Sequence, residues 1–266
     1  MVLPELVAID IETTGLYPDQ GDRICEIAFL RIRDDVVVEK LVTLVNPERE
    51  LSFASSFING ITNEMVRDIA PFRQVVGEVG SFLEGATVLI HNAAFDLSFL
   101  KAQMRACGRV FPPTQVIDTL KLARKYFTFT SNSLGNLADY FKISKNQVHR
   151  AESDAWTAYR VFCVLYPRLL EQGLQFDDLT FPSRRIDVGL NPEEFLPPFI
   201  ARSLGKKAWI SVRYAGGNAG VEQVEMEPVE IVREGGVWLL IAVCRPSGTE
   251  RRFLLDKIVE VMENIE

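Results

Sequence analysis

Five side chains that could act together on one substrate lie in three short segments of the first 154 residues. They are four carboxylates and a histidine: Asp10, Glu12, Asp96, His149 and Asp154. The chain has only two histidines, His91 and His149, and each stands five residues before one of these aspartates. Carboxylate oxygens are the ligands that Mg²⁺ and Mn²⁺ prefer, and an imidazole can exchange a proton near neutral pH. The set therefore predicts a centre for divalent cations with a histidine as proton acceptor.

The first segment is the apolar run VAIDIET, which is typical of a strand. Side chains alternate along a strand, so Asp10 and Glu12 are predicted to point to one place while Ile9 and Ile11 face the core. A turn at residues 13–15 follows and puts the two carboxylates at the edge of a sheet. An isolated pair of this kind would also fit a solvated strand end, so the pair gains its meaning from the other segments.

The second segment, TVLIHNAAFD, predicts a strand that ends at His91 and a helix that starts at about Ala93. Asp96 then lies in the first turns of the helix, where a carboxylate also suits the helix dipole. Phe95 is either a core residue or a residue beneath a base. His91 either orients a ligand or is a hydrogen-bonded, half-buried histidine.

The third segment, HRAESD, is informative through its spacing. On a continuous helix His149 and Asp154 would lie about 140° apart, which is too far to share a face. We therefore expect His149 on the loop before a helix and Asp154 within it, as suits a fixed metal ligand and a base that swings over a water. Two cations about 4 Å apart can activate that water and stabilise a leaving oxygen. The residues therefore predict phosphodiester hydrolysis with two Mg²⁺ or Mn²⁺ ions.

Composition sets the limits within which this centre must work. A chain of 266 residues, 47% hydrophobic and 24% charged, can bury one large or two smaller cores. A formal charge of −7 argues against a protein that holds long duplexes by broad phosphate neutralisation, and not against one that grips a few nucleotides through cations. With no basic segment before an apolar one and no long apolar run, we expect a cytoplasmic protein outside the membrane. The four cysteines are scattered and predict free thiols.

The pattern along the chain predicts a mixed sheet flanked by helices. Three strand-like runs, at residues 6–12, 24–33 and 36–45, form an antiparallel start, and Thr62 and Pro71 then mark helix starts. Further helices and one strand are predicted at residues 71–85, 87–91, 95–107, 118–127, 133–141 and 151–171.

Beyond these helices the amino-acid composition and the hydrophobic pattern change. Residues 173–204 are rich in Pro and Gly and predict a linker or adaptor, and strand-like runs separated by turns follow it. We therefore expect an α/β domain at residues 1–172, the linker at 173–204 and a small all-β, barrel-like domain at 205–266.

The segments AIDIETTG, HNAAFD and HRAESD resemble the three motifs of the DnaQ-like exonucleases. These form the histidine (DEDDh) branch of the DEDD superfamily, which includes the epsilon proofreading subunit of bacterial DNA polymerase III. The intervening SSFINGITNEMVRDIAPF also resembles that family, so the resemblance covers roughly residues 5–170. It implies a ribonuclease H-like fold and removal of nucleotides one at a time from a 3′ end.

The resemblance also implies a role for each motif residue. Asp10, Glu12 and Asp154 would hold the metals, Asp96 would hold the second one partly through water, and His149 would be the general base. The residues that would contact the substrate are Thr13, Thr14, Gly15, Ile61, His91, Asn92 and Phe95. One position departs from the pattern: epsilon-type proteins often have His before Gly-Ile-Thr, and Asn59 stands here. This departure concerns the handling of the strand end and not the hydrolysis.

The leading hypothesis for the substrate is the 3′ end of single-stranded DNA, in proofreading or repair, with a DNA polymerase or a replication or repair complex as possible partner. An RNA-trimming enzyme is the alternative, because catalytic carboxylates do not read the 2′-hydroxyl. A nucleotide-sensing regulator that uses its C-terminal domain is an alternative of another class. The complete set of metal ligands and the lack of a helix-turn-helix pattern argue against that regulator.

The C-terminal segments KAWISVRYAGG and VEMEPVEIVREGGVWLLIAVCRPSGTERRFLLDKI resemble the WYL domains of bacterial transcription regulators. Trp238-Leu239-Leu240 stands where the Trp-Tyr-Leu of that family would be, so the tyrosine is missing. The resemblance implies a small β-barrel that senses ligands, in some cases nucleic acid. Its candidate contact residues are Tyr214, Arg245, Arg251 and Arg252. A structural or dimerising barrel is the alternative.

Overall fold

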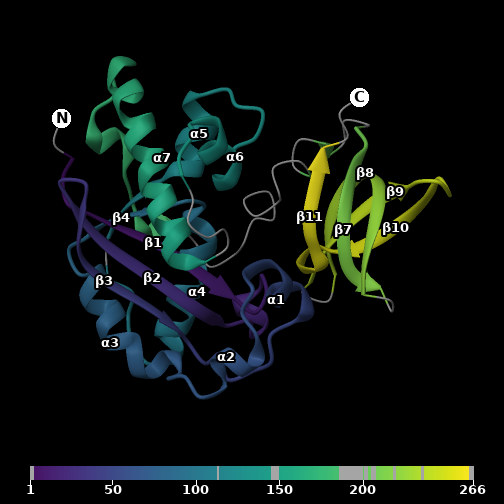
Figure 1. The fold of residues 1–266 in the computed structure, drawn as a ribbon, viewed down its shortest axis with the longest axis horizontal. Coiled ribbons are helices and arrows are strands. Elements are labelled where there is room, and N and C mark those ends of the chain that lie inside the picture. The colour runs from purple at the N-terminus through teal and green to yellow at the C-terminus, as the bar shows by residue number, and fades with distance from the viewer. Residues whose placement is uncertain are drawn as a thin grey trace.

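The fold consists of a six-stranded mixed sheet with helices on both faces, followed by a five-stranded antiparallel sheet, as Figure 1 shows. It is taken from a computed structural model that describes residues 3–112, 114–144, 150–185, 200, 203–204, 208–217, 220–234 and 237–263. The predicted fold class, a ribonuclease H-like mixed sheet followed by a small all-β unit, is confirmed. Among the described residues no helix has the length and apolar character needed to cross a membrane.

The first sheet has the strand order β3-β2-β1-β4-β5-β6. Its strands are β1 (Leu6–Thr13), β2 (Ile24–Arg33), β3 (Val36–Leu44), β4 (Thr87–Ile90), β5 (Gln115–Asp118) and β6 (Phe181–Pro182). The first three form the predicted antiparallel meander, β4 and β5 continue parallel to β1, and β6 closes the edge antiparallel to β5. The strand β1 therefore lies inside the sheet, between an antiparallel and a parallel neighbour.

The helices alternate with the later strands as the sequence predicts. They are α1 (Phe53–Asn59), α2 (Asn63–Arg67), α3 (Phe72–Leu83), α4 (Ala93–Ala106), α5 (Thr119–Tyr126), α6 (Leu134–Tyr140) and α7 (Ala151–Glu171), with short 3₁₀ turns η1 (Pro18–Gln20), η2 (Phe176–Leu179) and η3 (Ser183–Arg185). The expected caps are in place: the Thr62 hydroxyl accepts the N–H of Met65, and Pro71 precedes α3. Helix α1 and strand β5 were not predicted, because both are short and lack a clear hydrophobic period.

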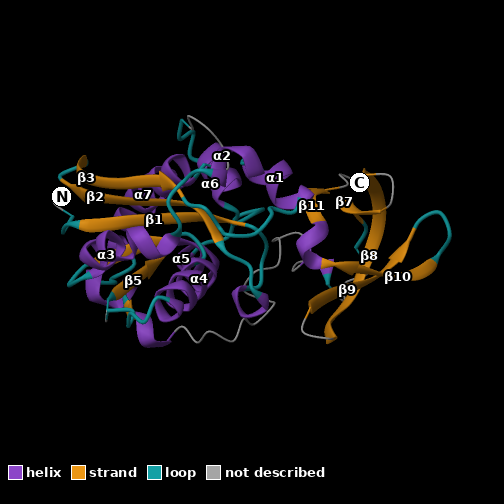
Figure 2. Ribbon diagram, turned by 90° about the horizontal axis from the view of Figure 1, so that it is seen from below, coloured by secondary structure: helices purple, strands orange, loops and turns teal. Residues whose placement is uncertain are grey.

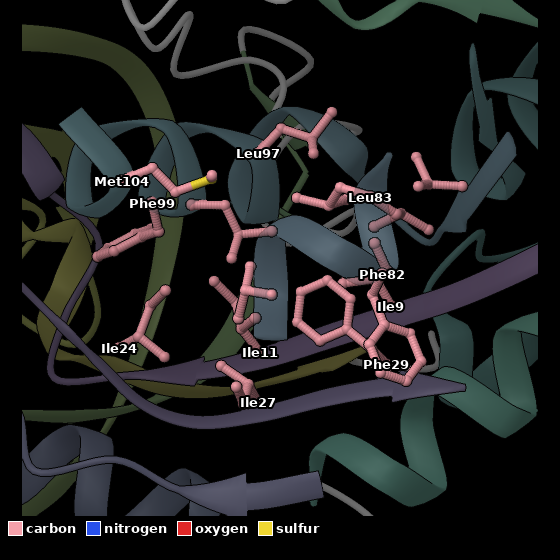
Figure 3. Packing of buried hydrophobic residues seen from close by; sticks show 14 of the residues in the cluster. Ile9, Ile11, Ile24, Ile27, Phe29, Phe82, Leu83, Leu97, Phe99 and Met104 are labelled. Carbon is pink, nitrogen blue, oxygen red and sulfur yellow. The ribbon is translucent and has the colours of Figure 1, made fainter. Parts of the chain in front are cut away.

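Alternation along β1 divides the core into two layers. Its residues Val7, Ile9 and Ile11 pack with α3 and α4, and Figure 3 shows Ile9 and Ile11 among the side chains of this layer. Leu6 and Ala8 point to the other layer, which α5, α6 and α7 cover. Both faces of β1 are buried, and an unpaired polar side chain is costly in such a place. Its polar residues are therefore expected at the strand's end, where water or a ligand can reach them.

Asp118 ties the first sheet to two helices. It ends β5, is 1% exposed, and accepts the N–H groups of Leu120 and Lys121 at 3.0 and 3.2 Å, which caps α5. It also accepts the N–H groups of Asn92 and Ala93 at 3.2 and 3.1 Å, at the start of α4. Asn92 itself has a left-handed backbone with φ of 74°. The start of α4, which carries Asp96, is therefore anchored to the neighbouring strand.

The second sheet has the order β10-β9-β8-β7-β11. Its elements are β7 (Ile210–Gly217), β8 (Gly220–Glu234), β9 (Val237–Cys244), β10 (Thr249–Leu254), η4 (Leu255–Lys257) and β11 (Ile258–Glu263). The runs VEQVEM and VEIV, which the sequence suggests as separate strands, form the single β8, because a shift of register between Pro228 and Glu230 lets the pairing with β9 continue. The sheet curls around its own core, which includes Met226, Leu240 and Phe253.

The segment after α7 contains short regular elements. Residues 176–185, inside the predicted linker, form η2, β6 and η3, and β6 pairs with β5. Residues 186–199, 201–202 and 205–207 of that linker lie outside the described residues.

The two sheets are in contact beside the end of β1. Leu16 packs against the core of the second sheet, and the Tyr17 hydroxyl accepts the backbone N–H of Trp238 at 3.4 Å. The guanidinium of Arg213 lies 4.7 Å from the ring centre of Phe57 in α1. Figures 1 and 2 both show α1 beside β11. The second sheet therefore touches the loop that follows β1.

Candidate active site

Three of the predicted carboxylates meet at the end of β1. One oxygen each of Asp10, Glu12 and Asp154 lies within 4.8 Å of the others. Asp10 and Glu12 share the face of β1 that α7 covers, and Asp154 lies in the first turn of α7. Segments more than 140 residues apart in the chain are thus brought to one point, as the alternation and the helical spacing predict.

Asp96 joins this group from α4. It is 3% exposed, and its Oδ1 accepts the backbone N–H of Ile11 at 3.1 Å. The pairing of β1 with β4 is described only up to Ala8, so Ile11 lies beyond the neighbouring strand and the carboxylate takes the place of a strand partner. The charge of Asp96 is the second cause, after burial, of the raised pKa of Asp10. The fourth carboxylate is therefore close enough to act on Asp10 and Glu12.

Crowding and burial make these groups hard to ionise. Burial raises the pKa of Asp10, Glu12 and Asp96 well above their usual values. For Glu12 the largest further cause is the charge of Asp154. Buried carboxylates repel one another when they are ionised. A hard divalent cation bound to their oxygens offsets that repulsion. The residues present therefore fit Mg²⁺ or Mn²⁺.

Glu26 and Arg150 hold the start of α7, and the sequence analysis missed both. Glu26 is 3% exposed and pairs with Glu12 across β1 and β2. The guanidinium of Arg150 donates to Glu26 from Nε at 3.1 Å and from Nη2 at 2.6 Å, and the N–H of Ala151 donates at 3.0 Å. An acid in the apolar run ICEIAFL was the available signal. Because Arg150 precedes α7, this ion pair fixes the helix that carries Asp154.

A second acid organises the loop after β1. The Asp22 carboxylate accepts the Thr14 hydroxyl at 3.1 Å and the Tyr17 N–H at 3.0 Å, and Arg49 binds it at 3.0 Å. A Cβ atom on Gly15 would collide with this carboxylate. The glycine of the first motif is therefore required by space rather than by an unusual backbone angle.

Asn59 connects α1 with the end of β1. It is 4% exposed, its Oδ1 accepts the N–H of Ile61 at 2.9 Å, and its Nδ2 reaches the carbonyl of Thr13 at 3.5 Å. Ile61 is fully buried. The residue that departs from the family pattern thus links two segments predicted to contact the terminal nucleotide.

The remaining predicted substrate residues lie at the start of α4. The Nδ1 atom of His91 is 2.9 Å from the hydroxyl of Thr119, and burial lowers the pKa of His91 to about 4. His91 is therefore neutral at neutral pH. The Phe95 ring lies 5.1 Å from that of Phe99 and packs against the core. Contact of these side chains with a substrate stays a prediction. His149 lies outside the described residues, so its position also stays a prediction.

The sheet order and the acidic cluster at the end of β1 define a ribonuclease H-like nuclease of the metal-dependent kind. A family model described as Exonuclease matches residues 7–162, more than half of the chain, so the chain belongs to the exonuclease family. A WYL domain model matches residues 199–262, and the resemblance of the C-terminal segment is thereby confirmed.

Two relatives show how much of the chain is shared. The chain is 35% identical over 164 residues to the 3′-5′ exonuclease DinG of Bacillus subtilis (strain 168), which covers 61% of this chain and 18% of that protein. It is 35% identical over 166 residues to the DNA polymerase III subunit epsilon of Rickettsia prowazekii (strain Madrid E), which covers 60% of this chain and 72% of that protein. The chain thus spans less than a fifth of DinG.

Two solved structures share the fold. Exonuclease X in complex with 5′ overhanging duplex DNA aligns with a TM-score of 0.52 at 26% identity, over 65% of this chain and 96% of that one. The nuclease domain of 3′hExo, a DEDDh family member bound to rAMP, aligns with a TM-score of 0.53 at 20% identity, over 64% of this chain and 92% of that one.

The crowded carboxylates predict the pH dependence of the metal-free protein. Their pKa values are higher in the folded than in the unfolded chain, so the folded state binds more protons and stability falls as pH rises above about 4. Asp10→Asn removes one repelling charge. In a chelator at neutral pH we expect its melting temperature to exceed the parent's by about 2–4 °C, or about 1 kcal/mol, and the difference to shrink toward acid pH.

Glu78→Gln is the matched control, because Glu78 is an exposed acid in α3 and loses the same charge. A melting temperature of Asp10→Asn equal to or below the parent's, measured in the chelator, would show that the carboxylates do not strain the fold.

The ion pair of Glu26 and Arg150 predicts a second effect on stability. Arg150→Ala leaves the Glu26 carboxylate buried without its counter-charge, which costs about 3 kcal/mol in the free energy of unfolding. The double variant Glu26→Gln/Arg150→Ala should recover part of this loss, because a neutral amide needs no counter-charge. Urea unfolding measures both, with exposed Arg160→Ala as control. Equal midpoints for Arg150→Ala and Arg160→Ala would contradict the role given to the pair.

Proposed function

We propose that this chain is a 3′-to-5′ exonuclease that releases nucleoside monophosphates one at a time from the 3′ end of single-stranded DNA. The observation that carries the proposal is the convergence of Asp10, Glu12 and Asp154 within 4.8 Å, with Asp96 beside them. Divalent cations at the reacting phosphate can promote phosphodiester hydrolysis, and the cluster is a donor set for them.

Two divalent cations, Mg²⁺ or Mn²⁺, complete the proposed site. Asp10, Glu12 and Asp154 would hold them, and Asp96 would hold the second one partly through water, because one of its oxygens already binds the N–H of Ile11. When bound, the cations would lower the pKa of the attacking water and stabilise charge on the leaving oxygen. His149 would take the proton of that water, and its neighbour Arg150 is fixed beside the cluster by Glu26.

The strand end would lie against the loop that Asp22 organises. Thr13 and Thr14 are buried at the end of β1, and the backbone at Gly15 lies close to the Asp22 carboxylate. Ile61, whose N–H is held by Asn59, would line the same nucleotide. His91, Asn92 and Phe95 would complete the contacts from the start of α4. A neutral His91 offers a hydrogen bond rather than a charge to the substrate.

The proposed partner follows from a relative that this chain covers for most of its length. A polymerase III epsilon subunit is matched over 72% of its length, which supports DNA as substrate and a polymerase or a replication or repair complex as partner. RNA is the second candidate, because carboxylate ligands do not distinguish the sugars.

We also propose how the chain is divided. Residues 1–172 would form the exonuclease domain, extended by β6, and residues 205–266 would form the WYL-like domain, with residues 173–204 between them. Each sheet has its own core. Since Leu16 and Tyr17 contact the second sheet, the β domain would influence the loop that holds the strand end.

The activity is tested with 5′-labelled single-stranded DNA and RNA of one sequence, with Mg²⁺ or with Mn²⁺. We expect a ladder of products shortened one nucleotide at a time, formed faster on DNA. Asp10→Ala should form none, and His149→Ala should lose about 10²–10⁴-fold in rate, because general-base catalysis contributes that much.

The control for this assay is Glu78→Gln, which carries an altered acid far from the cluster and should match the parent. Equal products from the parent and from Asp10→Ala would mean a contaminating nuclease and would end the proposal. A faster ladder on RNA would replace DNA with RNA as the proposed substrate.

The influence of the β domain is tested by ending the chain after Arg185. The first unit keeps both layers of its core, so we expect cleavage to be retained. The preference between DNA and RNA, or the KM for either, should change, because Leu16 and Tyr17 lose their contacts. Unchanged preference and KM would remove the reason for giving the β domain a part in substrate handling.

A further inference from the structure

A concave region lies beside the loop that follows β1. This open cavity of about 920 Å³ is lined by the segment after η1, the segment after β3, the start of α3 and the end of α4. Four arginines line it, Arg23, Arg49, Arg73 and Arg109, with Glu48 as the only acid of the lining. The whole chain carries a formal charge of −7. The cavity therefore gathers positive charge in a protein whose net charge is negative.

Two of the four arginines have acidic partners. Arg49 binds Asp22 at 3.0 Å, and Arg73 forms an ion pair with Glu48. The guanidinium groups of Arg23 and Arg109 are exposed and have no acidic partner within the described part of the chain. The Arg73–Glu48 pair is exposed on both sides, and exposed ion pairs contribute only about 0–1 kcal/mol, so an incoming anion can compete for Arg73 as well.

A buried amide points to the same kind of ligand. Gln103 lines the cavity from α4 and is 6% exposed. Its side-chain nitrogen is buried and has no hydrogen-bond acceptor among the residues that the structure describes. A buried donor left without a partner costs about 1–3 kcal/mol. An anionic oxygen in the cavity is the acceptor that this amide and the guanidinium groups of Arg23 and Arg109 lack.

The cavity and the loop predicted to hold the strand end are built from one piece of chain. The N–H of Arg23 donates to the Thr14 hydroxyl at 3.1 Å, and the Arg23 carbonyl accepts the N–H of Thr14 at 2.9 Å. Arg49 binds the Asp22 carboxylate that holds Thr14 and Tyr17. A strand that leaves the carboxylate cluster across this loop would therefore meet the arginines next.

We propose that this cavity is a second nucleic-acid contact, which binds backbone phosphates of the strand whose 3′ end occupies the carboxylate cluster. The proposal rests on the proposed function for its ligand. A guanidinium presents paired donors that match phosphate oxygens, and contacts of this kind position a strand without reading its sequence. A free nucleotide carries the same phosphate chemistry, so the test separates the two sources.

The test measures how salt weakens binding to the full-length protein in Mg²⁺. The probes are fluorescent single strands of about 20 and about 3 nucleotides whose 3′ linkages resist hydrolysis. Each phosphate contact contributes about 0.7 to the slope of log K against log salt. Arg23→Ala/Arg109→Ala should reduce the slope for the long strand by about 1.4. Between about 50 and about 200 mM salt, the parent should therefore lose about sevenfold more affinity than this variant.

The short strand should show a smaller change of slope than the long one, because it carries fewer phosphates that can reach the cavity. Lys125→Ala/Arg160→Ala is the matched control: it removes two exposed charges from α5 and α7, on the other face of the sheet, and should keep the parent's slope. Equal melting temperatures show that all variants are folded.

Three results would overturn the proposal. One is an unchanged slope in Arg23→Ala/Arg109→Ala. Another is an equal change in the control variant, which would indicate a general field rather than a site. The third is calorimetric binding of a nucleoside triphosphate that this variant loses while the slope for the strand stays the same, which would assign the cavity to a free nucleotide. A changed slope without any cleavage ladder would instead end the proposed activity and leave the cavity's binding intact.

Discussion

The structure depends on like charges held together at the end of one buried strand. Along β1 the residues that face α7 change from Leu6 and Ala8 to Asp10 and Glu12, so the same alternation that builds the core also delivers the carboxylates. Burial and mutual repulsion raise their pKa values. Such an arrangement persists only where the rest of the fold is stable enough to oppose it, and the apolar layers on both sides of β1 supply that stability.

The neighbouring ion pairs keep this repulsion within bounds. Glu26 lies across from Glu12 and would add a further buried negative charge if it stood alone. Its bidentate pair with Arg150 neutralises that charge, and the carboxylate also accepts the first N–H of α7. One side chain therefore serves both the electrostatics of the cluster and the position of the helix that brings Asp154. Asp118 has a related role at the start of α4.

The sequence predicted what depends on local period. Alternation placed Asp10 and Glu12, helical spacing placed Asp154, and cap residues such as Thr62 marked helix starts, because each follows from a few neighbouring residues. What it missed depends on pairing between distant segments. Arg150 and Glu26 are 124 residues apart, and no local pattern connects them. The same holds for the contact of Asn59 with Thr13.

Leu16 has a consequence for how such a protein can arise. This residue belongs to the sequence of the nuclease unit and yet packs against the core of the second sheet. A β domain joined to a nuclease with a polar residue at this position would lose that apolar contact. The two halves are thus not freely exchangeable modules, and a working recombinant must inherit the loop after β1 together with its C-terminal neighbour.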